Sequence, residues 1–171
     1  KAKQLQKDGY DVKNLTAGEP NFNTPEHIKK AAIQAIQAGK SDFYTATLGI
    51  VELRKAIAKA TNAQYHTDYT FENVAVTVGG KFSLYAVSQT ILDPGDEVLI
   101  PLPYWVSYSE QVKLAEGKPV FVFSETKSLK VTVAALEAKR TEKTKAVIIN
   151  SPQNPSGVIY TRAELEAIGN W

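Results

Sequence analysis

Cysteine and methionine are both absent from this chain of 171 residues, and histidine occurs only twice. Without cysteine the chain has no disulfide framework and no thiolate nucleophile. His27 and His66 lie far apart in the sequence and show no metal-ligand spacing, so we interpret both as surface residues. These absences exclude disulfide-stabilised proteins and thiol enzymes, and they leave no indication of a metal site.

Extremes of charge and hydrophobicity are lacking as well. The net charge is +2 and the basic residues are scattered, which argues against a nucleic-acid-binding surface. No apolar run reaches the length of a membrane span, and the first residues show no secretory signal pattern. Apolar residues make up 43% and charged residues 22%, as in ordinary globular proteins. The chain starts at Lys1 and stops at Trp171 within a predicted helix, which we interpret as a piece of a longer protein.

What the chain does contain is a regular alternation of short apolar runs and helical patterns. The apolar runs, rich in β-branched residues, predict strands over 74–78, 97–101, 119–123 and 146–150. Helical spacing predicts helices over 2–7, 25–38, 50–65, 82–92, the stretch that ends at 115, 132–139 and the stretch that starts at 161. This alternation predicts an α/β fold with a mainly parallel sheet covered by helices on both faces.

Capping residues and apolar stripes refine the helix predictions. Thr24 is expected as the N-cap of the second helix, with Pro25 at its first position, and Thr161 with Glu164 forms a capping box. The stripe predicted to be buried in the second helix is Ile28, Ala32, Ala35 and Ile36. In the third helix, the residues predicted to share one apolar side are Leu53, Ile57 and Ala60.

The stretch from Val74 to Lys81 joins a predicted strand to a helix through two glycines, Gly79 and Gly80. The first amides of a helix have no partner within the helix, and the helix dipole adds partial positive charge there. Glycines without Cβ atoms let an anion approach the main chain. The pattern therefore fits a phosphate site, and it fits a plain tight βα turn equally well.

Three unusual loops follow the predicted strands: 79–81, 103–105 and 151–157. Ligands of open α/β sheets bind beyond the carboxyl ends of the strands, so we expect these loops to cluster. Together they offer main-chain amides, the aromatic face of Trp105 and the side-chain amide of Asn154. A flat, polar, phosphorylated ring would use all three. The glycine turn has neither G-x-G-x-x-G nor Walker A spacing, which argues against a nucleotide-binding module.

In this ordered set of motifs the chain resembles the N-terminal part of a class I pyridoxal-phosphate-dependent aminotransferase of the aspartate aminotransferase type. The matching segments cover nearly the whole chain and stand in the order of that family. They are Ala17–Pro20 with Phe22, Thr24-Pro25, Tyr44 with Gly49, Glu52–Arg54, Val78–Lys81, Asp93–Asp96, Pro103–Tyr108, Asn150–Pro152 and Asn154–Gly157.

The resemblance implies pyridoxal 5'-phosphate as cofactor and a role for each matching residue. Main-chain amides of Gly80 and Lys81 would bind its phosphate, and Trp105 would stack on its ring. Asn154 would bind the ring hydroxyl. Trp105 and Asn154 would also lie near the substrate carboxylate, and Gly18 would contact the substrate through its backbone.

Tyr44 would reach the phosphate in the neighbouring subunit, which implies a homodimer with shared active sites. The peptide bond before Pro155 is a candidate for the cis form. From the residues alone, a simpler interpretation of each residue remains open. Trp105 could be a core side chain, Asn154 a turn residue, Tyr44 a surface aromatic and Gly18 a hinge.

Lys81 stands at a helix N-terminus, where an amine suits a Schiff base. In the family, however, the Schiff-base lysine lies downstream of Trp171, as do the aspartate at the ring nitrogen and the arginine at the substrate carboxylate. Only the backbone role is therefore carried over to Lys81. No catalytic residue is expected within this chain, and the piece alone is expected to be inactive.

The resemblance implies transamination between an L-amino acid, aspartate above all, and a 2-oxo acid in a cytoplasmic parent protein. Residues 1–22 would belong to the small domain and residues 23–171 to the N-terminal part of the large cofactor-binding domain. Two alternatives stay open at this point. One is another reaction on the same fold, such as a different amino donor or a β-lyase, and the other is a non-catalytic binding protein.

Overall fold

The computed structural model describes residues 2–13, 18, 22–124 and 127–171. The chain divides into two compact units, Lys1–Thr47 and Leu48–Trp171. The expected extended segment at 12–15 and the loop at 16–22 lie largely outside the described residues. Among the described residues, no helix has the length and apolar character that crossing a membrane requires.

The first unit contains helix α1 (Ala2–Lys7) and helix α2 (Glu26–Gln37). Both end as predicted: Gly9 and Gly39 adopt left-handed φ values of 88° and 66°, which glycine accepts without strain. The expected N-cap at Thr24 is wrong. Helix α2 begins one residue later than predicted, at Glu26, with Pro25 in the extended cap position and no side-chain cap bond.

The expected burial of one face of α2 is also wrong. Helix α2 has no buried residue, and Ile28 and Ile36 are 49% and 64% exposed. An amphipathic stripe identifies the face that another element would cover, but burial requires that element to be packed there. The described part of the first unit provides no such element.

The second unit contains a three-stranded sheet built from β1 (Glu97–Pro101), β2 (Lys118–Val122) and β3 (Thr144–Val147). The strand order is β2-β1-β3 and both pairs are parallel, with Leu99 of β1 opposite Val120 and Val147. Three of the four predicted strands are therefore present: β1 has the predicted bounds, β2 lies one residue earlier, and β3 starts two residues and ends three residues earlier than predicted. Past the end of β3, the N–H of Ile148 still donates to the carbonyl of Leu99 at 3.0 Å.

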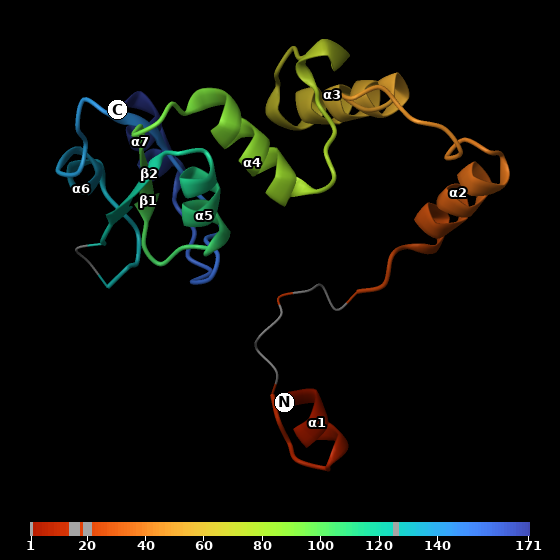
Figure 1. Ribbon diagram of the computed structural model, residues 1–171, viewed down its shortest axis with the longest axis horizontal. Coiled ribbons are helices and arrows are strands. Elements are labelled where there is room, and N and C mark those ends of the chain that lie inside the picture. The colour runs from red at the N-terminus through yellow and green to blue at the C-terminus, as the bar shows by residue number, and fades with distance from the viewer. Residues whose placement is uncertain (1, 14–17, 19–21, 125–126) are drawn as a thin grey trace. The chain divides into compact units, whose positions relative to one another are not determined.

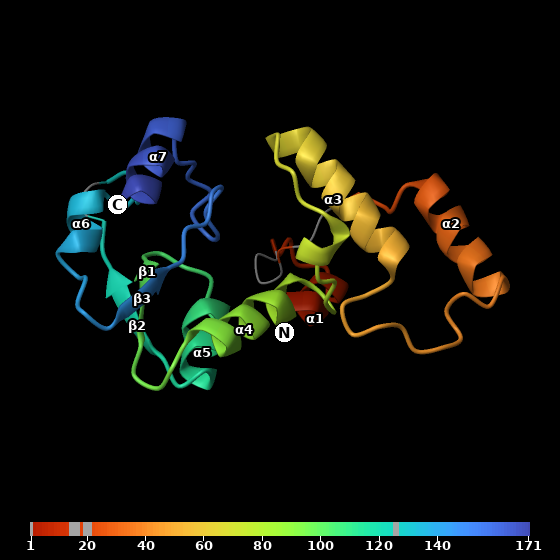
Figure 2. The ribbon, with the colours of Figure 1, turned by 90° about the horizontal axis from the view of Figure 1, so that it is seen from above.

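Strand β1 lies at the centre of the sheet and is buried along its whole length. Leu99 packs in one cluster with residues of α6 (Val133–Glu137) and α7 (Arg162–Asn170). Val98 and Ile100 face the other way and pack against α5 (Ser107–Leu114). Figure 2 shows α6 and α7 on one side of the sheet and α5 on the other, which confirms the predicted coverage of both faces.

The fourth predicted strand, Val74–Val78, is wrong as a strand. It follows a short 3-10 helix, η1 (Phe71–Asn73), and runs without regular secondary structure. A strand needs a neighbour that completes its hydrogen-bond ladder. Here the N–H of Val76 donates to the carbonyl of Leu48, and the carbonyl of Val74 accepts from the side chain of Arg54. Neither partner belongs to a strand.

Helices α3 (Val51–Tyr65) and α4 (Gly80–Ile91) flank this segment in the sequence (Figure 1). Helix α4 begins at the glycine break, as predicted. In α3 the predicted apolar side is wrong: Leu53 is 43% exposed and Ala60 is exposed, whereas Arg54 and Ala58 are buried. The Arg54 guanidinium lies 5.2 Å from the ring centroid of Phe71 and donates to Val74, so the buried face of α3 is organised around an arginine.

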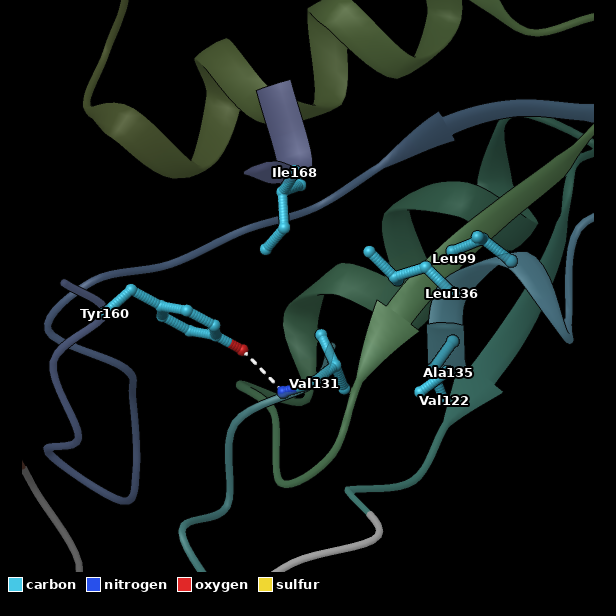
Figure 3. Packing of buried hydrophobic residues seen from close by; sticks show 7 residues of the cluster. All are labelled: Leu99, Val122, Val131, Ala135, Leu136, Tyr160 and Ile168. Carbon is cyan, nitrogen blue, oxygen red and sulfur yellow. Dashed lines mark hydrogen bonds between the residues drawn. The ribbon is translucent and has the colours of Figure 1, made fainter. Parts of the chain in front are cut away.

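The cluster on the α6 and α7 face contains one buried polar contact. The hydroxyl of Tyr160 accepts a 3.0 Å hydrogen bond from the N–H of Val131, and both residues are at least 95% buried (Figure 3). A buried N–H that loses its acceptor costs about 1–3 kcal/mol.

We therefore expect Tyr160→Phe to lower the free energy of unfolding by about 1–3 kcal/mol. Tyr69→Phe, at a tyrosine that is 50% exposed, is the control and should change the free energy by less than about 0.5 kcal/mol. Urea unfolding followed by circular dichroism measures both. Equal midpoints for the two variants would contradict the role given to the Tyr160 hydroxyl.

The predicted capping box at the start of α7 is confirmed: Thr161 accepts from the N–H of Glu164, and Glu164 accepts from the N–H of Thr161. The Lys130 ammonium lies 2.6 Å from the same carboxylate. The hydrogen bond from Lys130 and those from Thr161 lower the pKa of Glu164 to about 2.

A carboxyl whose pKa is lower in the folded state contributes stability above its unfolded pKa and loses it as the pH falls through the folded pKa. We therefore expect the contribution of Glu164 to disappear between about pH 4.5 and about pH 2. Glu164→Gln should flatten this part of the plot of unfolding midpoint against pH. A plot for Glu164→Gln that runs parallel to that of the unchanged chain would show that the contacts of Glu164 add no stability.

Candidate functional site

The candidate site lies beyond the carboxyl ends of β1 and β3. The loop after β1 leads to α5 on one face of the sheet, and the loop after β3 leads to α7 on the opposite face. Neighbouring parallel strands whose connections leave to opposite faces open a crevice at their carboxyl ends, which is where ligands of such sheets bind. A small hollow at this position is lined by Ile100, Tyr104, Tyr108, Asn150, Gln153 and Asn154, among others.

The turn that precedes α4 presents free main-chain amides. Gly79 occupies the N-cap position of α4 with φ 91° and ψ 159°, and no side chain caps the helix. Its carbonyl accepts from the N–H groups of Phe82 and Ser83. Among the described residues, none accepts from the N–H of Gly80 or Lys81, so these two donors and the helix dipole are available to an anion.

Hydroxyl groups brace this turn from the side. Thr77 donates to the carbonyl of Gly79 at 3.0 Å, and its hydroxyl lies 2.6 Å from that of Ser83 in the first turns of α4. A Cβ atom built on Gly79 or Gly80 would meet no atom within 4 Å, so the space beside the free amides is open. The hydroxyl contacts therefore stabilise the turn, and the space beside its free amides stays accessible.

Trp105 lies close to this turn. The Nζ atom of Lys81 lies 4.9 Å from the ring centroid of Trp105, within the range of a cation–π contact. Tyr108, one turn further along, packs edge-on against the half-buried indole, with centroids 5.5 Å apart and an interplanar angle of 90°. Burial raises the pKa of the Tyr108 hydroxyl. The glycine turn and the 103–105 loop therefore come together, as the sequence predicts.

The turn over 151–157 lies next to the same loop. The side-chain amide of Gln153 donates to the carbonyl of Pro103 at 2.8 Å, and the side chain of Asn150 accepts from the N–H of Asn154 at 2.8 Å. The Asn154–Pro155 peptide bond is cis, as the resemblance implied, and so are Leu102–Pro103 and Ser151–Pro152. Asn154 is exposed at the mouth of the hollow that it shares with Tyr104 and Tyr108.

The sequence profile of the family "Aminotransferase class I and II" matches residues 10–170. The chain belongs to this family.

Aminotransferases of several bacteria resemble the chain along its whole length. It is 51% identical to an aspartate aminotransferase of Geobacillus stearothermophilus over 99% of this chain and 43% of that protein. It is 46% identical to an asparagine–oxo-acid transaminase of Streptococcus mutans over 100% of this chain and 44% of that protein. The chain thus spans less than half the length of these aminotransferases.

Solved structures of aminotransferases have the same fold over this length. The aspartate aminotransferase of Thermus thermophilus with maleate superposes with a TM-score of 0.92 at 43% identity, covering 99% of this chain and 44% of that one. The enzyme of Rhizobium meliloti gives a TM-score of 0.90 at 42% identity, covering 99% of this chain and 42% of that one.

Of the aminotransferase residues expected from the sequence, the structure brings four into one neighbourhood: Gly80, Lys81, Trp105 and Asn154. Gly18 and Tyr44 belong to the first unit and are both exposed. The binding roles of all six stay predictions.

Sequence reasoning missed the residues that support these four. Thr77, Ser83, Tyr108 and Asn150 each hold a loop through a contact given above. Tyr108 and Asn150 lie inside segments that match the family, and Thr77 directly precedes one. The role of each residue depends on the direction in which its side chain points, and a sequence pattern does not show this direction.

Gly79 allows a direct test of the turn geometry. Its φ and ψ fall in a region that is almost restricted to glycine, so Gly79→Ala should cost about 1–3 kcal/mol of folding free energy. Gly80 lies in the helix with open space at its Cβ position, so Gly80→Ala should be neutral or slightly stabilising. Urea unfolding compares the two variants, and a Gly79→Ala chain as stable as Gly80→Ala would contradict the strain assigned to this turn.

Proposed function

We propose that the complete protein carrying this chain transfers an amino group between an L-amino acid, aspartate above all, and a 2-oxo acid, with pyridoxal 5'-phosphate as cofactor. The observation that carries the proposal is the turn with two free main-chain amides, from which the Lys81 side chain reaches the indole of Trp105. Family membership and the names of the aminotransferases that resemble the chain support it.

The residues present fit the cofactor. A phosphate needs N–H donors and open space, and the amides of Gly80 and Lys81 offer both at a helix N-terminus. A planar ring needs a flat partner, and Trp105 is held edge-on by Tyr108. A ring hydroxyl needs a polar side chain, and Asn154 is exposed beside the same loop.

Bound there, pyridoxal phosphate would supply a ring that accepts electrons from the α-carbon of the amino acid. The chain would contribute orientation. Gly80 and Lys81 would hold the phosphate, while Trp105 and Asn154 would hold the plane of the ring. Trp105 and Asn154 would also lie near the substrate carboxylate, and Gly18 would contact the substrate through its backbone. The lysine that binds the cofactor covalently would lie outside these 171 residues.

The proposal includes a homodimer with shared active sites, in which Tyr44 reaches the phosphate of the neighbouring subunit. The full exposure of the Tyr44 side chain, 107% of its reference area, suits a residue that serves another subunit. We further propose that residues 1–22 belong to the small domain, that residues 23–171 belong to the large domain, and that the protein works in the cytoplasm.

The test is the amount of 2-oxo acid that the complete protein and the 171-residue piece form from aspartate in the presence of pyridoxal phosphate. We expect turnover by the complete protein only when a 2-oxo acid acceptor is present, and none by the piece alone. Asparagine as donor and prephenate as acceptor belong in the assay because similar proteins bear their names. More than one equivalent of product per active site without an acceptor would indicate a lyase, and turnover by the piece alone would contradict the proposal.

Trp105→Ala in the complete protein should lower kcat/KM for aspartate by at least about tenfold, since a stacked aromatic ring and its buried area together exceed about 1.4 kcal/mol. Trp171→Ala is the control. Its indole donates to Glu137 at 2.9 Å and belongs to none of the loops of the site. Equal activities for the two variants would contradict the proposal that Trp105 belongs to the site.

A further inference from the structure

Two glutamine side chains are buried between the loops of the site. Gln111 and Gln153 are each 6% exposed, although glutamine is usually a surface residue. Each uses its side-chain amide to donate to a main-chain carbonyl far away in the sequence. Gln111 donates to Lys81 at 2.8 Å, and Gln153 donates to Pro103 at 2.8 Å.

The Gln111 bond joins the first turn of α4 to the middle of α5. Its acceptor, Lys81, carries one of the two free amides, and α5 begins directly after the loop that holds Trp105. The bond therefore determines how far the free amides lie from the indole. The contact between the Lys81 ammonium and the Trp105 ring involves only the end of the exposed lysine side chain. It therefore does not fix the position of the Lys81 main chain.

The Gln153 bond does the same for the third loop. Gln153 directly precedes Asn154 in the 151–157 turn, and its acceptor, Pro103, stands shortly before Trp105. The side-chain oxygen of Gln153 accepts from the hydroxyl of Ser156, so the amide group is held at both ends. Gln153 thus ties the 151–157 turn to the Trp105 loop, and Gln111 ties the first turn of α4 to the helix that follows this loop.

We propose that Gln111 and Gln153 are positioning residues that set the span between the phosphate-holding amides, Trp105 and Asn154. The inference rests on the proposed function, because this span matters only if one ligand contacts all three loops. A ligand of fixed length is sensitive to such a span, since displacements near 1 Å reduce the efficiency of a site by about a hundredfold. A ligand that contacts only one loop is not sensitive to this span.

This difference defines the experiment. In the complete protein, Gln111→Met and Gln153→Met keep the volume of the side chain and remove the donor. The dissociation constant of pyridoxal phosphate, followed by the absorbance of the bound cofactor, should rise at least about tenfold in each variant. The dissociation constant of inorganic phosphate for the Gln111→Met protein, which depends on the groups that hold the phosphate and not on the span to Trp105 and Asn154, should stay within about twofold of the unchanged value.

Gln89→Met is the matched control. Gln89 donates to the carbonyl of Leu114 at 2.9 Å and so joins the same two helices, α4 and α5, away from the glycine turn. Its variant should bind pyridoxal phosphate as the unchanged protein does. If either methionine variant fails to fold, Gln111→Asn or Gln153→Asn, which keeps the amide but shortens its reach, makes the same comparison.

The outcomes separate the two proposals. An unchanged protein that does not bind pyridoxal phosphate overturns the proposed function and this inference with it. Binding by the unchanged protein, with Gln111 and Gln153 variants no weaker than the Gln89 variant, overturns the inference alone. Parallel losses of pyridoxal phosphate and inorganic phosphate also overturn it, because they indicate damage to the turn rather than a changed span.

Discussion

The burial of β1 on both faces is the constraint on which the rest of the second unit depends. Because successive side chains of a strand point to opposite faces, Leu99 has to be covered from one side, and Val98 and Ile100 from the other. This requires a helix layer on each face. The connection after β1 leads to α5 on one face, and the connections after β2 and β3 lead to α6 and α7 on the other. The crevice at the carboxyl ends is a consequence of that arrangement.

The site is assembled from loops, so its precision has to come from bonds between loops. The turn before α4 offers amides and the 103–105 loop offers an indole, but neither defines a site alone. A buried amide-to-carbonyl bond joins the 151–157 turn to the 103–105 loop, and a second one joins the first turn of α4 to α5, the helix that follows that loop. An aminotransferase site built this way would combine an open, polar mouth with a backbone that has little freedom underneath.

Part of this arrangement could be predicted from residue patterns. The runs that became β1, β2 and β3 are short, apolar and separated by helical spacing, and the capping box at Thr161 carried enough local information to place α7. The order of the motifs led to the family, which the match over residues 10–170 establishes. The meeting of the glycine turn with Trp105 was predicted as if Val74–Val78 were a strand of the sheet; the two come together although that segment is not a strand.

Other expectations failed where a neighbour was needed. Val74–Val78 has the composition of a strand, yet it lacks a strand partner, and a ladder is a property of two segments. The stripe of α2 is apolar, but burial is decided by what packs on it. In α3 a buried arginine replaced the expected apolar side, because Phe71 and the carbonyl of Val74 offered it partners.

Local pattern was therefore enough to predict β1, β2, β3 and the helices of the second unit, to predict the glycine-dependent turn and to indicate the family. These depend on side-chain spacing and on the backbone freedom of single residues. The folded chain alone revealed that Gln111 and Gln153 are buried and which carbonyls they meet, since their partners stand 30 and 50 residues away. Such pairs are created by packing, and nothing in the neighbouring residues marks them.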